Sequence, residues 1–276
     1  MNKTGNYENE SVFFRKEREK MNINIEEVKE IVLEAAKLFQ NREAVTHTRE
    51  KGIADYVTAV DISVQHFICA RLADKYPEIQ FLGEEKDNSE IDKHGLVWVL
   101  DPVDGTTNLI HDYHASVISL GLIDNMDMVM GIVYNPYLKE MFWAEKGKGA
   151  YLNGKRIYVS EAATMEQSLI SIGTSPYHKE MAEENFKVFR HIFQDAQDIR
   201  RSGSAALDLA YVASGRIEGY FEKRLKIWDY AAGMVLVREA GGKVTNYQGV
   251  DSGVDYMADI VAGNKAVADI LVKKYL

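Results

Sequence analysis

Apolar residues recur with helical spacing near the start of the chain. Between residues 25 and 39 they return every three or four positions, which predicts an amphipathic helix. A second helix is indicated by the apolar positions from Val64 to Leu72, and it must end before Pro77, which cannot continue a helix. Asp61 lies where the N-cap of this second helix is expected. The pattern therefore predicts two helices ahead of the first strands.

Short apolar runs follow these helices. Residues 80–85 and 97–100 each predict a strand, and the second strand runs directly into the segment DPVDGTTN. Further apolar runs lie between residues 115 and 145 and are separated by turns that contain asparagine. Short strands and turns in this order are typical of an antiparallel meander.

Beyond residue 158 the pattern changes, because strands now alternate with helices. The helices are expected over residues 179–194, 204–213, 228–240 and 264–276. This alternation indicates an α/β unit built in layers. We therefore predict a polar N-terminal arm, an N-terminal α+β domain and a C-terminal α/β domain, over residues 1–20, 21–158 and 159–276.

Composition and charge restrict the partners of the protein. Of its 276 residues, 46% are hydrophobic and 27% are charged, as expected for a globular protein. The net charge of −9 opposes nonspecific binding to nucleic acids or anionic membranes, so neither is expected as a direct partner. The single cysteine, Cys69, excludes an internal disulfide and favours a reducing, cytoplasmic location. No apolar run is long enough to span a bilayer.

Acidic residues lie where predicted strands end and helices begin. Glu84 ends one strand, Asp101 and Asp104 follow the next, and Asp229 opens a helix. Clustered carboxylates repel one another, and a divalent cation removes this repulsion. Oxygen ligands favour magnesium, calcium or manganese. Asp101 and Asp104 could instead only stabilise the loop and cap the following helix.

The segment after these acids suggests phosphate chemistry. Gly105 lets an anion approach the backbone, and a helix that begins here would offer free N–H groups to a phosphate. Carboxylates for metal beside N–H groups for an anion suit the hydrolysis of a phosphate ester, and bound metal would supply the positive charge that the protein lacks. The D-x-x-D spacing differs from the D-x-D of haloacid-dehalogenase phosphatases, and the chain has no Walker A lysine motif.

Several sequence blocks together resemble the signatures of the inositol monophosphatase family. They are DYVTAVD (55–61), LGEE (82–85), DPVDGTTN (101–108) and WDYAAG (228–233) with EAGG (239–242), in the order of the family. The resemblance implies a magnesium-dependent, lithium-sensitive phosphatase of the sugar phosphatase superfamily. It also implies a layered αβαβα sandwich with the metals between its two halves, and a homodimer.

The resemblance further implies a metal site. Glu84, Asp101 and the Val103 carbonyl would hold a first magnesium ion. Asp101, Asp104 and Asp229 would hold a second, and a weaker third ion would lie near Glu84. We therefore expect two or three Mg²⁺ ions in each active site.

Catalytic and substrate-binding residues are implied in the same way. Thr106 would bind the attacking water and contact Asp61, so that this pair helps to remove the proton of the water. Glu84 is implied as a third catalytic residue beside Thr106 and Asp61. The Gly105 and Thr106 amides would bind the phosphate. Contacts to the alcohol half of the substrate are implied for Asp104, Ala205 and Glu222.

The identity of the substrate stays open at this level. Inositol 1-phosphate is the leading expectation, but Lys223, Arg224 and Lys226 follow Glu222 and could bind a second phosphate. Fructose 1,6-bisphosphate, NADP or another sugar or nucleotide phosphate would then compete. The same three residues could also simply face the solvent. A different class of function is a binding protein of the transcription machinery, because some bacterial relatives associate with it.

Overall fold

The computed structural model describes residues 23–52 and 55–276, so the predicted arm over residues 1–20 lies outside the described residues. Within these ranges, one mixed sheet has the strand order β3-β4-β5-β6-β7-β8-β9. We call it the larger sheet. Its strands are β3 (Gln80–Gly83), β4 (Leu96–Asp104), β5 (Val117–Asp124), β6 (Asp127–Asn135), β7 (Glu140–Glu145), β8 (Gly149–Leu152) and β9 (Lys155–Ile157). The predicted meander is therefore confirmed.

A smaller sheet is formed by later residues and has the order β11-β10-β12-β14-β13. Its strands are β10 (Leu169–Ile172), β11 (Asp198–Arg200), β12 (Gly219–Lys226), β13 (Lys243–Thr245) and β14 (Met257–Gly263). A separate hairpin precedes both sheets and consists of β1 (Thr48–Gly52) and β2 (Asp55–Thr58). It lies before α4, so the prediction that both helices precede the first strands was wrong. Every residue of β1 is exposed, so this strand has no buried apolar face to reveal it in the sequence.

The helices lie outside and between the sheets. They are α2 (Ile25–Ala35), α3 (Arg42–Thr46), α4 (Ala59–Lys75), α5 (Thr106–Ile110), α6 (Ala182–Asp195), α7 (Ala205–Ala213), α8 (Ile227–Glu239) and α9 (Lys265–Ile270). Short turns of other helix types lie at Ala36–Gln40, Met165–Gln167, Lys179–Met181 and Leu271–Tyr275. No helix in the described ranges is long and apolar enough to cross a membrane.

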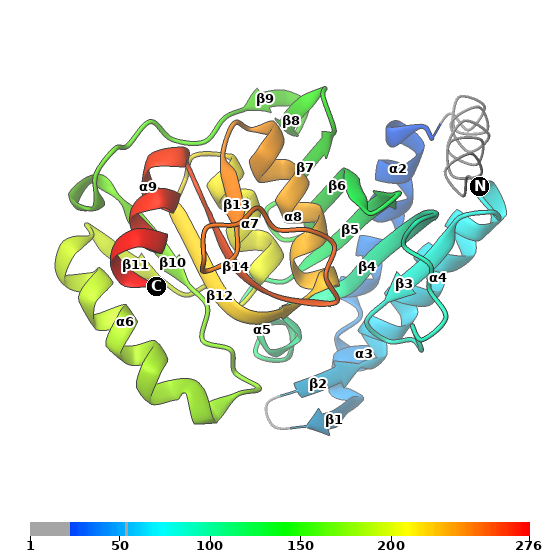
Figure 1. Ribbon diagram of the computed structural model, residues 1–276. Coiled ribbons are helices and arrows are strands. Elements are labelled where there is room, and N and C mark those ends of the chain that lie inside the picture. Colours follow the sequence, from blue (N-terminus) through cyan, green and yellow to red (C-terminus); the bar gives the residue numbers. More distant parts are fainter. Residues whose placement is uncertain (1–22, 53–54) are drawn as a thin grey trace, which may run out of the picture.

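These elements stack as the predicted αβαβα sandwich (Figure 1). Helices α2 and α4 cover the outer face of the larger sheet, and α6 and α9 cover the outer face of the smaller one. Helices α7 and α8 fill the space between the sheets. The division near residue 158 falls between the sheets in sequence, but it stays a prediction because side chains from both halves share the central core.

Helix α4 begins three residues earlier than the N-cap prediction implies. Thr58 is the N-cap, and its hydroxyl accepts a hydrogen bond from the Val60 N–H at 3.1 Å. Asp61 occupies the third helical position and accepts the Thr58 N–H at 2.8 Å in a capping box. The prediction of Asp61 as N-cap was therefore wrong, because an acid near a helix start suits both positions.

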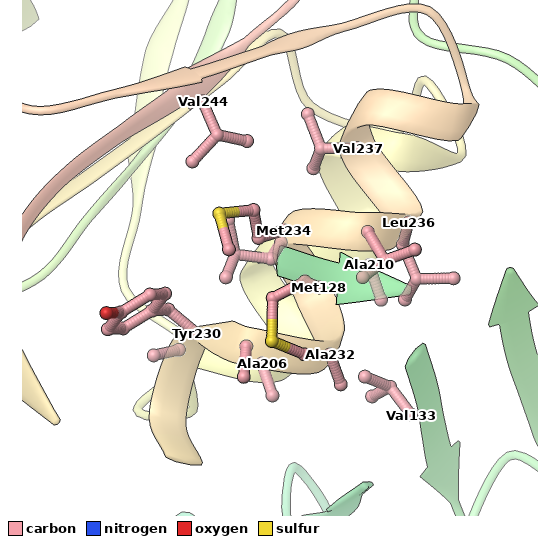
Figure 2. Packing of buried hydrophobic residues seen from close by; sticks show 14 of the residues in the cluster. Met128, Val133, Ala206, Ala210, Tyr230, Ala232, Met234, Leu236, Val237 and Val244 are labelled. Carbon is pink, nitrogen blue, oxygen red and sulfur yellow. The ribbon is translucent and has the colours of Figure 1, made fainter. Parts of the chain in front are cut away.

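Helix α8 is buried on nearly all sides, which explains why its sequence shows little amphipathic character. Its small residues let it approach the larger sheet closely: a Cβ added at Gly131 on β6 would lie 2.3 Å from the Ala232 carbonyl oxygen. Figure 2 shows Ala232 and Met234 of α8 in this core near Met128 of the larger sheet. The position of α8 is therefore fixed by close packing.

We predict that Gly131→Ala destabilises the protein by about 1–3 kcal/mol, because the new methyl group would force α8 away from the sheet. Urea unfolding of both proteins measures the difference. Gly253→Ala is the matched control, since its Cβ would meet nothing closer than 3.8 Å. Equal stability of Gly131→Ala and the unmodified protein would contradict the close approach.

Candidate active site

The ends of β3 and β4 bring Glu84 and Asp101 to the same place. The two strands are parallel, with Gly83 opposite Leu100, so Glu84, which follows β3, lies beside Asp101 of β4. The Glu84 N–H also donates to the Leu100 carbonyl at 3.2 Å. Glu84 lies at the end of β3 as predicted, whereas β4 continues to Asp104, so Asp101 and Asp104 lie within this strand and do not follow it.

An irregularity in β4 brings Asp104 to the same side as Asp101. Asp101 pairs with Ser119 and Asp104 with Val117, so three steps along β4 match two along β5. Residues three apart in a regular strand point to opposite faces, whereas one extra residue restores a shared face. This bulge includes Pro102, whose ring leaves no N–H to pair.

Asp229 reaches the same site from the start of α8. It is the third residue of the helix, and its Oδ2 accepts the Lys226 N–H at 2.7 Å. Burial is the main cause that raises the pKa of Asp101 well above its usual value, and the charges of Glu84, Asp104 and Asp229 raise it further. The four carboxylates therefore lie close enough to interact.

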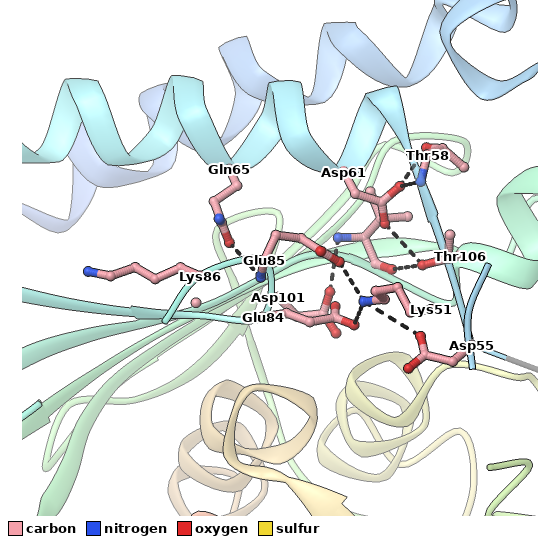
Figure 3. Close-up of polar contacts among 12 residues, drawn as sticks. Lys51, Asp55, Thr58, Asp61, Gln65, Glu84, Glu85, Lys86, Asp101 and Thr106 are labelled. Carbon is pink, nitrogen blue, oxygen red and sulfur yellow. Dashed lines mark hydrogen bonds and ion pairs between the residues drawn. The ribbon is translucent and has the colours of Figure 1, made fainter. Parts of the chain in front are cut away.

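Lys51 of the β1–β2 hairpin neutralises part of this charge (Figure 3). Its Nζ lies 3.0 Å from Glu84 Oε1, 2.7 Å from Glu85 Oε1 and 3.5 Å from Asp55 Oδ1. Burial still raises the pKa of Glu84 to about 7, although the nearby ammonium lowers it. Nothing in the sequence pattern pointed to Lys51, because it reaches Glu84 only through the fold of the hairpin.

Thr106 contacts Asp61, as the sequence blocks implied. Its hydroxyl lies 3.0 Å from Asp61 Oδ1 and 3.1 Å from the Val103 carbonyl oxygen, so it can donate to either (Figure 3). Asp61 also accepts the Thr58 N–H and hydroxyl, at 2.8 and 2.5 Å. Burial raises the pKa of Asp61, while these donors oppose the shift.

The chain begins helix α5 directly beside these acids. Gly105 is its N-cap, with a φ of +90°, and no side chain caps the helix. A Cβ at Gly105 would lie 3.1 Å from the Ala115 carbonyl oxygen and 3.2 Å from that of Gly203. Both the dihedral angle and the crowding therefore require glycine here.

The carboxylates fit a divalent cation in their chemistry, although their oxygens now face protein donors. Across residues 23–52 and 55–276, no three acidic, histidine or cysteine side chains surround one point closely enough to hold a metal ion. Asp104 Oδ2 instead accepts the Ser204 hydroxyl and the Ala206 N–H, each at 2.6 Å. The buried, mutually repelling oxygens are nevertheless a donor set that magnesium, calcium or manganese prefers.

Comparisons with known proteins identify the family of the chain. The model of the inositol monophosphatase family matches residues 17–275. The chain belongs to the inositol monophosphatase family.

Relatives within the inositol monophosphatase family carry two kinds of name. The Nus factor SuhB of Xylella fastidiosa is 38% identical over 238 residues, which are 84% of this chain and 85% of that protein. The inositol-1-monophosphatase of Mesorhizobium japonicum is 38% identical over 224 residues, 81% and 84% of the two chains. The crystal structure of the extragenic suppressor protein suhB from Bartonella henselae has a TM-score of 0.85 at 34% identity, covering 91% of this chain and 99% of that one.

Glu222 and Ala205, implied as substrate contacts of a family member, lie on neighbouring elements. Glu222 is buried in β12; its Oε1 accepts the Ser175 N–H and its Oε2 the Tyr220 hydroxyl, both at 2.7 Å. Ala205 is the first residue of α7, directly after the N-cap Ser204 that donates to Asp104. The Ser204 hydroxyl thus links this helix to the carboxylate site.

Two of the three basic residues after Glu222 have other partners, whereas Arg224 is exposed, as the solvent-facing alternative allowed. Lys223 lies 2.6 Å from Glu184 and its Nζ is 5.4 Å from the centre of the Tyr247 ring. Lys226 packs over Tyr256, with 5.1 Å from its Nζ to the ring centre. These contacts do not favour a second phosphate at the two lysines. Simple solvent exposure is not favoured either, because the Lys223 side chain is only 17% exposed.

We predict that the metal-free protein loses stability as the pH rises from about 4.5 to about 7. Burial raises the pKa of Glu84 to about 7 and that of Asp104 to about 6, above their unfolded values of 4.5 and 3.8. The native state therefore binds these protons more tightly than the unfolded state does. The stability that this binding contributes is complete below the unfolded pKa and is lost as the pH rises through the native pKa. The Tm measured in EDTA should fall between pH 5 and pH 7.5.

Glu84→Gln serves as the comparison for this pH series. In this variant the Tm should decrease less with rising pH, but it should still decrease. The reason is that burial also raises the pKa of Asp104 to about 6 and that of Asp208 to about 7. A Tm that rises over the same range in EDTA would contradict the assignment.

Proposed function

We propose that the protein hydrolyses a phosphate monoester with the help of magnesium ions. The observation that carries the proposal is that four buried or half-buried carboxylates from three segments lie close enough for their charges to interact, beside the uncapped start of α5. An acidic cluster next to free backbone N–H groups suits a cation and a phosphate together. Family membership supports the same reading.

The metal ligands would be the oxygens already described. Glu84, Asp101 and the Val103 carbonyl would hold one magnesium ion, and Asp101, Asp104 and Asp229 a second, with a weaker third near Glu84. When bound, the ions would neutralise the carboxylates, activate a water molecule and stabilise the leaving oxygen. Lys51 would have to release Glu84, because its ammonium group lies at 3.0 Å from that carboxylate.

The proton and the phosphate would be handled by the chain itself. The Thr106 hydroxyl would orient the attacking water and pass a proton toward Asp61, 3.0 Å away. Burial raises the pKa of Asp61, which makes its carboxylate a better proton acceptor than an exposed aspartate. The Gly105 and Thr106 N–H groups would bind the phosphate oxygens, where the left-handed glycine leaves the backbone accessible.

The alcohol half of the substrate would lie against Asp104, Ala205 and Glu222. We propose inositol 1-phosphate as the leading substrate, supported by the name of the Mesorhizobium relative. Fructose 1,6-bisphosphate, NADP or another sugar or nucleotide phosphate are alternatives for the same site. A homodimer and inhibition by lithium are further proposals that follow from the family resemblance.

We predict that Thr106→Val lowers kcat by about 100-fold or more, because the hydroxyl that leads to Asp61 is lost. Phosphate release from inositol 1-phosphate, with and without magnesium, measures the effect. Thr107→Val is the matched control, since Thr107 is the next residue in α5 and its side chain is exposed. Equal kcat values for both variants would contradict the proposed role.

A second candidate function is association with the transcription machinery. It is favoured by the relative from Xylella fastidiosa, which is named a Nus factor. The net charge of −9 makes protein partners more suitable than RNA for such a role. For this function we predict that an affinity-tagged chain retains RNA polymerase or a Nus protein from a bacterial extract, and that Thr106→Val leaves the retention unchanged. Recovery of neither partner would contradict this candidate.

A further inference from the structure

Asp208 is a buried carboxylate that the proposed chemistry does not use. It belongs to α7, whose other residues are apolar or aromatic, and it is only 4% exposed. Ala206 and Ala210 of the same helix pack in the central core (Figure 2), and Asp208, two positions from each, lies on the opposite side of α7. Burying a carboxylate costs stability unless hydrogen bonds compensate. The contribution of Asp208 therefore lies in the hydrogen bonds that it accepts.

Ser202 is the hydrogen-bond partner of Asp208. Its hydroxyl donates to Asp208 Oδ2 at 2.7 Å, and its oxygen accepts the Ser204 N–H at 3.0 Å. The Ser204 carbonyl oxygen also lies 3.0 Å from this hydroxyl. Because a hydroxyl has one hydrogen to donate, the closer carboxylate selects its direction and leaves the oxygen of Ser202 facing the Ser204 N–H.

Ser204 connects this contact to the carboxylate site. It is the N-cap of α7, and its hydroxyl donates to Asp104 Oδ2 at 2.6 Å. The Ala206 N–H donates to the same oxygen, also at 2.6 Å. Since both donors belong to the start of α7, the orientation of the Asp104 carboxylate is set by how this start is held.

Ser202 is also bonded to helix α5. Its carbonyl oxygen accepts the Asn108 side-chain N–H at 3.0 Å, and Asn108 donates to the Ala115 carbonyl at 2.8 Å as well. Asn108 lies in α5, whose start is the proposed phosphate site. Ser202 therefore joins the starts of α5 and α7, and Asp208 fixes the side chain of Ser202.

We propose that Asp208 is a positioning residue, which acts through a chain of two serine hydroxyls to orient Asp104 for a divalent cation. This inference rests on the proposed function, in which Asp104 is a metal ligand. Hydrogen-bond partners behind a metal ligand hold its orientation, and their loss typically weakens metal binding by about 10- to 100-fold.

The test measures Mn²⁺ binding to the metal-stripped protein by calorimetry. It is done at pH 8, because burial raises the pKa of Asp208 to about 7 and the group is then mainly a carboxylate. Asp208→Ala should weaken Mn²⁺ binding by about 10-fold or more. Asp208→Asn keeps an oxygen that can accept from Ser202 and should restore most of the affinity.

Val212→Ala is the matched control. Val212 is buried in α7 one turn after Asp208 and has an apolar side chain. Its truncation should lower the Tm, because it leaves a cavity, and should leave the affinity for Mn²⁺ unchanged. An equal loss of affinity in Val212→Ala and Asp208→Ala would overturn the inference, because destabilisation of α7 would then explain both.

A double-mutant cycle separates positioning from independent effects. Ser202→Ala should weaken Mn²⁺ binding as much as Asp208→Ala, and the double variant should be no weaker than either, because each interrupts the same chain. Additive losses in the double variant, or an unchanged affinity in Asp208→Ala, would overturn the inference. Where Asp208→Ala does not fold, an unchanged affinity in Ser202→Ala overturns it alone.

Phosphate release from inositol 1-phosphate separates this inference from the proposed function. In Asp208→Ala the magnesium concentration for half-maximal rate should rise, and in Asp208→Asn it should return toward that of the unmodified protein. Mn²⁺ binding that depends on Asp208 in a protein that hydrolyses no ester would support the inference and contradict the proposed function. Absence of Mn²⁺ binding to the unmodified protein would overturn both.

Discussion

Mutual repulsion among the clustered carboxylates is the constraint on which the rest of the site depends. Glu84, Asp101, Asp104 and Asp229 are brought together although burial and their neighbours' charges raise their pKa values. The Lys51 ammonium group and backbone N–H donors partly offset the repulsion among these carboxylates. A cation would relieve the same repulsion more fully, so the arrangement that weakens the metal-free fold is also the one that suits metal binding.

Rigid packing keeps the acids in place against this repulsion. The position of Asp229 is set by α8, which packs closely between the two sheets, as the close approach of Gly131 to this helix indicates. Asp104 depends on the bulge in β4 and on Ser204, which belongs to the start of α7. The central core and the site are therefore coupled, because the helices that fill the core also carry the polar groups that reach the carboxylates.

Sequence blocks predicted much of this arrangement because the acids lie at element ends, where chain direction restricts their placement. The contact between Thr106 and Asp61 is present, whereas the N-cap prediction for Asp61 failed because a capping box places the acid three positions later. The basic residues after Glu222 show a further limit of prediction from the sequence. A run of positive residues in sequence says nothing about their partners, and Lys223 meets Glu184 from α6, 39 positions away.

The sequence by itself indicated the family, most of the helices and strands, and the acids that we propose for the site, but it did not reveal the β1–β2 hairpin before α4. Hydrophobic periodicity reports which face of an element is buried, and local motifs report how a strand or helix ends. Only the tertiary structure decided that Lys51 forms an ion pair with Glu84 and that the Ser204 hydroxyl at the start of α7 donates to Asp104. These facts depend on contacts between segments far apart in the chain, and such contacts leave no periodic or local signal for a single sequence to reveal.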